Sequence, residues 1–148
     1  MTKRIDVEAL QRRVGASYPA PYDEPCRTRE RRALGDAAGL TGFGVNLLTI
    51  PPGGWSSQRH WHASEDEFIY VVAGEVVLVT DFGVEVLRAG DAAGFRAGDA
   101  DGHHLQNRSA ADATVLEVGD RLSDRVVYSD IDLIADDDGY LHRDGRRY

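Results

Sequence analysis

Between residues 40 and 118, short apolar runs alternate with glycine, proline and aspartate, a pattern typical of strands joined by tight turns. Their near-regular spacing, with no long helical pattern between them, predicts an all-β fold of the sandwich or barrel class. The runs predicted as strands are 45–50, 68–72, 75–80, 84–87, 92–95, 103–107 and 113–118.

Two extensions flank this predicted core, and we interpret all 148 residues as one domain. In the N-terminal extension, residues 1–39, the spacing of apolar residues predicts a short helix over 5–14 that Gly15 ends. The basic run 27–32 predicts a solvated face or a cover for an acidic neighbour. The C-terminal extension, residues 119–148, is acidic, and its apolar runs predict packing on the outside of the core or on a partner subunit.

Charge and composition exclude several classes of partner. The formal net charge is -8, from 25 acidic and 17 basic side chains, which argues against binding to nucleic acid or to an anionic membrane. No apolar run approaches the ~20 residues that span a bilayer, and the N-terminal sequence lacks the apolar core of a signal peptide. The single cysteine, Cys26, excludes an intrachain disulfide and fits a reducing compartment. We therefore expect a cytoplasmic protein.

The candidate chemistry is a His-x-His pair with acidic residues nearby. His60 and His62 share one face if they lie in a strand, because side chains alternate along it. Glu67 follows after a short loop, and His103 arrives about forty residues later on another strand. Imidazole and carboxylate ligands admit Fe, Mn, Ni, Zn or Co, and ligand type alone does not choose among them.

Two longer patterns resemble the signature motifs of the cupin superfamily. The first is Gly54-x5-His60-x-His62-x4-Glu67-x6-Gly74, and the second is Gly90-x5-Arg96-x-Gly98-x4-His103-x3-Asn107. The second departs from the family pattern, with Arg96 in place of proline and two extra residues after Gly98. The resemblance covers about residues 40–118 and implies a small jelly-roll β-barrel that binds one divalent transition metal. The ligands it implies are His60, His62, Glu67 and His103.

Several neighbouring residues compete for these roles. The family histidine precedes its asparagine by four positions, which favours His103 over His104 as the ligand, although a β-bulge would swap their faces. Glu65 and Asp66 are alternative carboxylates, and we expect both to face solvent in the loop.

Further catalytic groups are harder to assign. Tyr70 is a candidate proton donor or a packing residue, and Arg96 is a candidate clamp for a substrate carboxylate or a surface residue. An isomerase or lyase also needs an acid/base group beside the metal, for which the candidates are Tyr70, His104 and Glu117. The apolar residues expected on the barrel wall predict a rather apolar cavity: Val71, Val77, Leu87, Phe95 and Leu105.

Taken with the resemblance, these residues predict a metalloenzyme acting on a small polar or anionic organic molecule. The reaction classes implied are those of a dioxygenase, an isomerase or epimerase, a lyase or a decarboxylase. The alternative is a non-catalytic module that binds or senses a small ligand. The resemblance also implies a homodimer.

Overall fold

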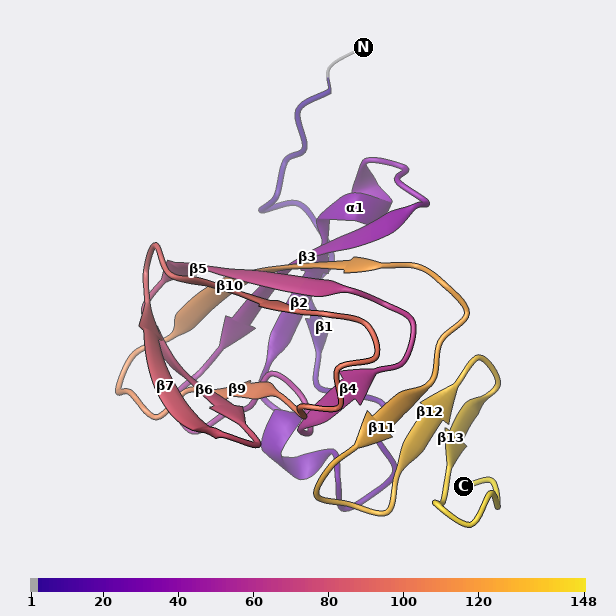
Figure 1. The fold of residues 1–148 in the computed structure, drawn as a ribbon. Helices are drawn as coiled ribbons and strands as arrows, with labels where there is room; N and C mark the ends of the chain where they lie inside the picture. The colour runs from indigo at the N-terminus through magenta and orange to yellow at the C-terminus, as the bar shows by residue number, and fades with distance from the viewer. Residues whose placement is uncertain (1–2) are drawn as a thin grey trace.

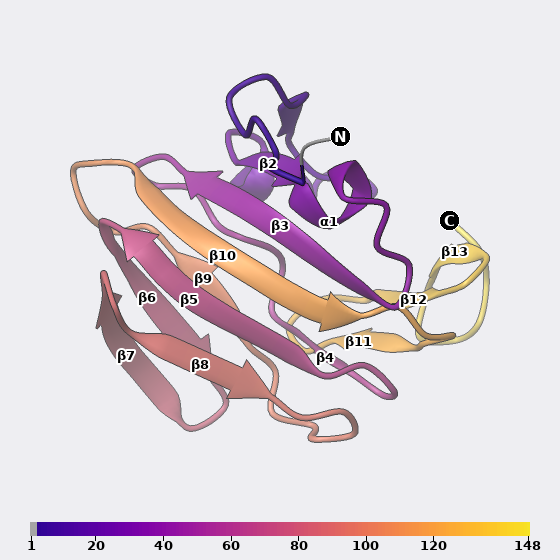
Figure 2. The ribbon, with the colours of Figure 1, turned by 90° about the horizontal axis from the view of Figure 1, so that it is seen from above.

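The structure is a computed structural model that describes residues 3–148, so Met1 and Thr2, part of the predicted N-terminal extension, lie outside the described residues. It consists almost entirely of antiparallel strands in two layers (Figures 1 and 2). The one α-helix of the described chain is α1 (Leu34–Ala37), and a 3-10 turn spans Glu24–Cys26. No helix within residues 3–148 has the length and apolarity needed to cross a membrane.

One layer is a six-stranded sheet. Its strands in spatial order are β1 (Arg13–Val14), β2 (Glu30–Ala33), β3 (Phe43–Ile50), β10 (Ala113–Asp120), β5 (Glu67–Ala73) and β8 (Ala92–Phe95). The central strands β3, β10 and β5 correspond to three of the predicted apolar runs. All pairings in this sheet are antiparallel, as expected for a jelly roll.

The opposing layer contains two smaller sheets. The three-stranded sheet is β7 (Gly83–Arg88), β6 (Glu75–Thr80) and β9 (His104–Gln106). The four-stranded sheet is β13 (Gly139–Leu141), β12 (Ile134–Asp136), β11 (Val126–Tyr128) and β4 (His60–His62). The all-β prediction is confirmed, but the three sheets do not join into one closed ring.

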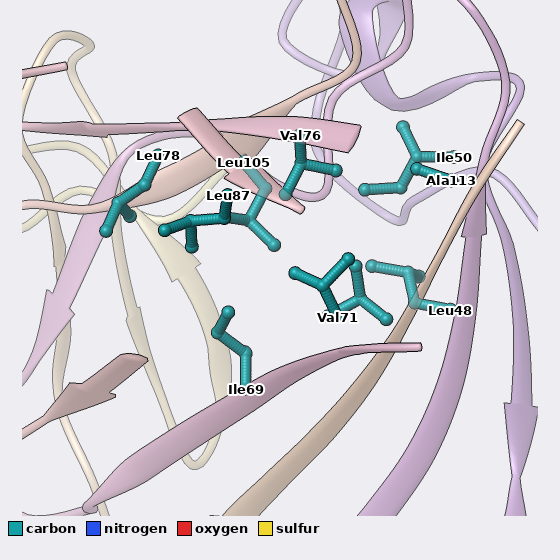
Figure 3. Packing of buried hydrophobic residues seen from close by; sticks show 10 residues of the cluster. Leu48, Ile50, Ile69, Val71, Val76, Leu78, Leu87, Leu105 and Ala113 are labelled. Atoms are coloured by element: carbon teal, nitrogen blue, oxygen red, sulfur yellow. The ribbon is translucent and has the colours of Figure 1, made fainter. Parts of the chain in front are cut away.

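The hydrophobic core fills the space between the six-stranded and three-stranded sheets. Leu48, Val115 and Val71 form a cross-strand row on β3, β10 and β5, and all three side chains are completely buried. Leu87 and Leu105 face them from the opposing layer (Figure 3). Val71, Leu87 and Leu105, which were predicted to line a cavity, therefore pack against one another, because such side chains interdigitate at the density of a core.

A glycine closes the turn between β5 and β6. Gly74 has φ +77, a left-handed conformation that favours glycine, and a Cβ atom there would lie 2.6 Å from the carbonyl oxygen of Asp112. This position explains why the first motif ends in glycine: any side chain would push the β5–β6 hairpin away from the start of β10.

The extensions differ from the predictions. Residues 5–14 form no helix, and Arg13–Val14 instead adds strand β1 to the edge of the six-stranded sheet. The basic run 27–32 is not a solvated face, because Arg29 and Arg32 are buried. The ion pairs agree with the other reading, a cover for acidic neighbours: Arg31 faces the cavity and pairs with Glu117, whereas Arg32 lies on the opposite face of β2 and pairs with Glu8.

The C-terminal extension is also more integrated than predicted. Strand β11 pairs antiparallel with β4, which places Val126 opposite His62 and Tyr128 opposite His60. Strands β12 and β13 then extend the same sheet. Residues 119–148 thus do not lie on the outside of the core, because they build the layer that covers one end of the six-stranded sheet.

Candidate metal centre and adjoining cavity

The His-x-His pair lies on β4 with both imidazoles on one face, as the period of a strand predicts. The ring centroids of His60 and His62 are 5.0 Å apart. Nδ1 of His60 lies 2.8 Å from the carbonyl oxygen of Gln58. A proton on Nδ1 would donate to that carbonyl, which orients the ring and leaves Nε2 as the lone-pair nitrogen.

Glu67 faces the two histidines from the opposite layer. Its carboxylate oxygen Oε2 lies 3.2 Å from Nε2 of His62 and 3.5 Å from Nε2 of His60. The short loop between β4 and β5 allows this approach, because it carries the chain from one layer to the other. One ligand atom from each of the three residues lies within 4.8 Å of the other two, so the group could hold a metal ion.

His103 joins the same cluster through a main-chain bridge. It exchanges two backbone hydrogen bonds with His60, of 3.1 and 2.9 Å, so the two side chains are neighbours on one face. Nε2 of His103 lies 2.8 Å from Oε2 of Glu67. Phe95 stacks on the imidazole with ring centroids 3.6 Å apart. The structure thus brings together all four predicted ligands.

The electrostatics of the cluster follow from burial and mutual contact. Burial alone would raise the pKa of Glu67, but hydrogen bonds from His103, His60 and His62 outweigh it and hold that pKa well below its usual range. Burial lowers the pKa of His103, which is only 5% exposed. One carboxylate and three imidazoles are the oxygen and nitrogen donors that a divalent transition metal prefers, so the residues fit such a metal.

Asp124 supports the cluster from the C-terminal extension. Its Oδ2 lies 2.5 Å from Nδ1 of His62, while its Oδ1 accepts a hydrogen bond from the backbone of Ser64. Burial acts to lower the pKa of His62, but Glu67 and Asp124 outweigh it and raise the pKa to about 9. Carboxylates commonly contact the outer nitrogen of a metal-binding histidine in this way. Sequence spacing offers no signal for Asp124, because it lies far from the motif.

The two alternative carboxylates behave differently from each other. Asp66 is exposed, as predicted, and accepts a backbone hydrogen bond from Ala97. Glu65 does not face solvent: it is half-buried, with Oε2 3.6 Å from Nδ1 of His62 and Oε1 accepting from the backbone of Leu122. Glu65, His62 and Asp124 form a second acidic group, which shares its histidine with the first.

A cavity of about 480 Å³ adjoins the cluster, between the six-stranded and four-stranded sheets. Gly44 and Gly119 lie in the same cross-strand row as Glu67, and the absence of side chains there leaves space beside the carboxylate. The cavity is polar rather than apolar, which corrects the prediction. The polar and aromatic residues that line its inner part are Tyr18, Arg29, Arg31, Asn46, Ser57, Glu117 and Tyr128.

Among the charged residues that line the cavity, Arg31 and Glu117 lie on the six-stranded sheet and Arg29 lies next to it. Glu117 is opposite Asn46 on β3 and Ile69 on β5, in the row beside that of Glu67. Nη2 of Arg31 lies 3.3 Å from Oε2 of Glu117. Sequence reasoning missed Arg29 and Arg31, because their run of charge suggested solvent. The only signal in the sequence was the two-residue spacing of Arg29 and Arg31, which places both on one face of a strand.

The structure separates the remaining catalytic candidates from the cavity. Tyr70 is 41% exposed on the outer face of β5, which argues against a role as proton donor in the cavity of the same chain. Arg96 is exposed and does not line the 480 Å³ cavity, which argues against a clamp for a substrate carboxylate there. The position of Tyr70 follows from strand alternation, because it is offset by an odd number of residues from Glu67 on β5.

His104 takes a packing position. Its Nδ1 lies 2.8 Å from the carbonyl oxygen of Ser57, its Nε2 lies 3.0 Å from Nε2 of Gln106, and its ring meets Trp55 edge-on. Burial lowers the pKa of His104 to about 4. The geometry therefore supports the preference for His103 over His104 as the ligand.

The comparisons with known proteins agree with this geometry. A family model described as the cupin domain matches residues 46–119. A crystal structure described as a sugar phosphate isomerase from a cupin superfamily, from Silicibacter pomeroyi, is 41% identical, with TM-score 0.93 and coverage of 98% of this chain and 96% of the other. A candidate sugar phosphate isomerase from Acidithiobacillus ferrooxidans is 30% identical, with TM-score 0.72 and coverage of 77% and 74%.

A more distant structure matches in fold alone. A polyketide cyclase from Streptomyces resistomycificus is 23% identical, with TM-score 0.64 and coverage of 81% of this chain and 80% of the other. No curated protein sequence matches the chain. Since the family model spans both motifs and the first relative aligns over nearly its whole length, the chain belongs to the cupin superfamily.

Proposed function

We propose that this protein is a metal-dependent isomerase for small phosphorylated sugars. The observation that carries the proposal is the position of the His/Glu cluster beside a polar cavity whose lining includes Arg29, Arg31 and Glu117. The 41% identical relative from Silicibacter pomeroyi, whose description names a sugar phosphate isomerase, supports this choice. The cavity volume is in the range of pockets that bind small molecules.

In this proposal, His60, His62, Glu67 and His103 hold one divalent transition metal, drawn from Fe, Mn, Ni, Zn or Co. The four residues bring their donor atoms together from both layers. When bound, such a metal would polarise a carbonyl or hydroxyl oxygen of the substrate. Burial of the cluster would exclude bulk water from that oxygen.

Proton transfer is assigned to Glu117. Conversion of an aldose to a ketose moves one proton from C2 to C1 and one from O2 to O1, and it needs no oxidant or reductant. Glu117 is the only one of the three acid/base candidates that lines the 480 Å³ cavity, since Tyr70 and His104 do not. Its position in the row beside that of Glu67 supports a role for this carboxylate near the proposed metal.

The other reaction classes receive less support. An oxygenase for an organic substrate favours an apolar pocket, whereas the lining of this cavity includes Arg29, Arg31 and Glu117. A non-catalytic binding module would use the same cavity without turnover. The activity experiment below separates that alternative from the proposal.

Metal analysis tests the ligand set. The purified protein should retain about one equivalent of a first-row transition metal per chain. His62→Ala should lose it and melt at a lower temperature, while His104→Ala, which removes a neighbouring buried imidazole outside the cluster, should retain it. Equal metal retention in the two variants would overturn the assignment.

Deuterium exchange tests the reaction. The metal-loaded protein should incorporate solvent deuterium at C1 or C2 of aldose and ketose phosphates. Proton NMR measures this incorporation. Glu117→Gln should abolish the exchange while retaining metal. Sugar phosphates that bind without any exchange in the unmodified protein would favour the binding module instead.

We also propose that the protein is a homodimer. The outer face of the six-stranded sheet carries two apolar cross-strand rows: Leu47, Leu116 and Tyr70, then Val45, Val118 and Phe68. Phe68 and Tyr70 are more than two-fifths exposed. A contiguous apolar face of this kind is typical of a protein interface, and a second copy is the simplest occupant. The cytoplasmic location stays a prediction from the sequence.

A further inference from the structure

Arg29 and Arg31 both line the cavity, but only Arg31 pairs with a carboxylate. Arg29 is only 8% exposed, and its guanidinium donates to the carbonyl oxygens of Gly15 (from Nε, 3.2 Å) and Ser56 (from Nη1). Within residues 3–148, no carboxylate lies within ion-pair distance of Arg29. The backbone bonds hold the side chain rigidly but leave its positive charge without a counter-ion.

Arg31 is also incompletely satisfied. Its Nη2 pairs with Glu117 at 3.3 Å, but its Nε is buried and has no hydrogen-bond partner among the described residues. Burial and the nearby charge of Arg31 lower the pKa of Arg29, as expected for two cations held close together away from water. Among the described residues, Arg29 is thus left without an ion-pair partner, and Arg31 keeps one unused donor.

The strands set the order of these groups across the cavity floor. Arg31 lies in the row of Leu48, Glu117 in the next row, and Glu67 in the row after that. Glu117 is therefore between the arginines and the metal-binding cluster. A small molecule lying along these rows would present one end to the arginines and the other to the histidines.

We propose that Arg29 and Arg31 form the subsite that binds the phosphate group of the substrate. The inference rests on the proposed function and extends it by naming the residues that select a phosphorylated sugar. The planar guanidinium donates hydrogen bonds that match phosphate oxygens, so a phosphate would provide an ion-pair partner for Arg29 and an acceptor for Nε of Arg31. Glu117 competes with the phosphate for Arg31, so binding of phosphate releases this carboxylate toward the substrate carbons.

The test measures binding of inorganic phosphate to the metal-loaded protein by titration calorimetry. Arg31→Gln should weaken binding by about tenfold or more, because it removes a charged hydrogen-bond partner. Glu117→Gln should instead strengthen binding, because it removes the competing carboxylate. A matched control is Arg88→Gln, since Arg88 pairs with Glu75 at 3.1 Å on an exposed hairpin outside the cavity; this variant should bind phosphate normally.

Other outcomes would overturn the subsite. Unchanged affinity in Arg31→Gln would do so, as would weaker binding in Glu117→Gln. Loss of phosphate binding in His62→Ala, with no effect of Arg31→Gln, would place the phosphate on the metal instead. If Arg31→Gln does not fold, Arg31→Lys keeps the charge without the planar fork and should bind phosphate with intermediate affinity.

This experiment separates the two proposals. Phosphate binding needs no turnover, so a protein that binds phosphate through Arg31 but exchanges no deuterium would retain the subsite and lose the isomerase. A protein that exchanges deuterium into unphosphorylated sugars as readily as into sugar phosphates, with Arg31→Gln unaffected, would retain the isomerase and lose the subsite.

Discussion

At the scale of single residues, the orientation of His60 and of His62 depends on the partner of the outer ring nitrogen. For His60 that partner is a backbone carbonyl, that of Gln58, whereas for His62 it is the carboxylate of Asp124. A carboxylate partner makes the imidazole more basic than a carbonyl partner does, which strengthens it as a metal ligand. Asp124 is thus a positioning residue in the proposed centre, although it would touch no metal itself.

The corresponding prediction concerns Asp124→Asn. An amide can still accept the hydrogen bond from the backbone of Ser64 but supplies no negative charge to His62, so metal affinity should fall by about 10–100-fold. Competition with a chelator of known affinity measures this change. Asp138→Asn, an exposed substitution in the same acidic extension, serves as the control, and equal affinities in the two variants would contradict the positioning role.

The sequence allowed prediction of the four candidate ligands but not of their surroundings. His60 and His62 follow from the two-residue period of a strand, and His103 follows from its family spacing; its backbone bridge to His60 agrees. Asp124 and Arg31 enter the site only through strand pairings of the two extensions. Such long-range pairings depend on register, which local composition does not encode.

At the scale of elements, β4, which carries His60 and His62, depends on its pairing with β11. β4 is only three residues long and has its strand neighbour in β11, with Val127 opposite Trp61. The same short segment supplies Tyr128 to the cavity. The extension was difficult to predict because its strands are brief and its acidic composition suggests a surface position.

Disruption of β11 should therefore affect the site as well as stability. Val127→Pro removes a backbone donor from a strand that pairs on both sides, at a cost of about 1–3 kcal/mol. Each kcal/mol shifts the Tm of a chain of this size by about 2–4 °C, so we expect a fall of several degrees together with weaker metal retention. Val127→Thr keeps the backbone donor and suits a strand, so it should neither lower the Tm nor weaken metal retention. Calorimetric melting with metal analysis checks both, and unchanged metal retention in Val127→Pro would contradict the dependence of β4 on β11.

At the scale of the whole molecule, the space between the layers is divided between stability and chemistry. The half beneath the three-stranded sheet contains the apolar cluster, while the half beneath the four-stranded sheet contains the cavity and the His/Glu cluster. Charged groups are tolerated in the second half because they contact one another and the cavity rather than apolar neighbours. The inner face of the six-stranded sheet thereby serves both halves, and the association that we propose uses its outer face.

Tyr70 offers the sharpest test of that association. It stands at one end of an apolar row with Leu116 and Leu47 on the outer face, so Tyr70→Lys would place a charge in the proposed interface. The unmodified protein should sediment as a dimer at tens of micromolar. In the variant, the Kd of the dimer should rise by about tenfold or more, because an unpaired buried charge is costly. Phe82→Lys, at a hairpin tip that is 91% exposed, should leave the dimer intact. A monomeric unmodified protein, or a Tyr70→Lys dimer of unchanged affinity, would show that this face is not the interface between copies.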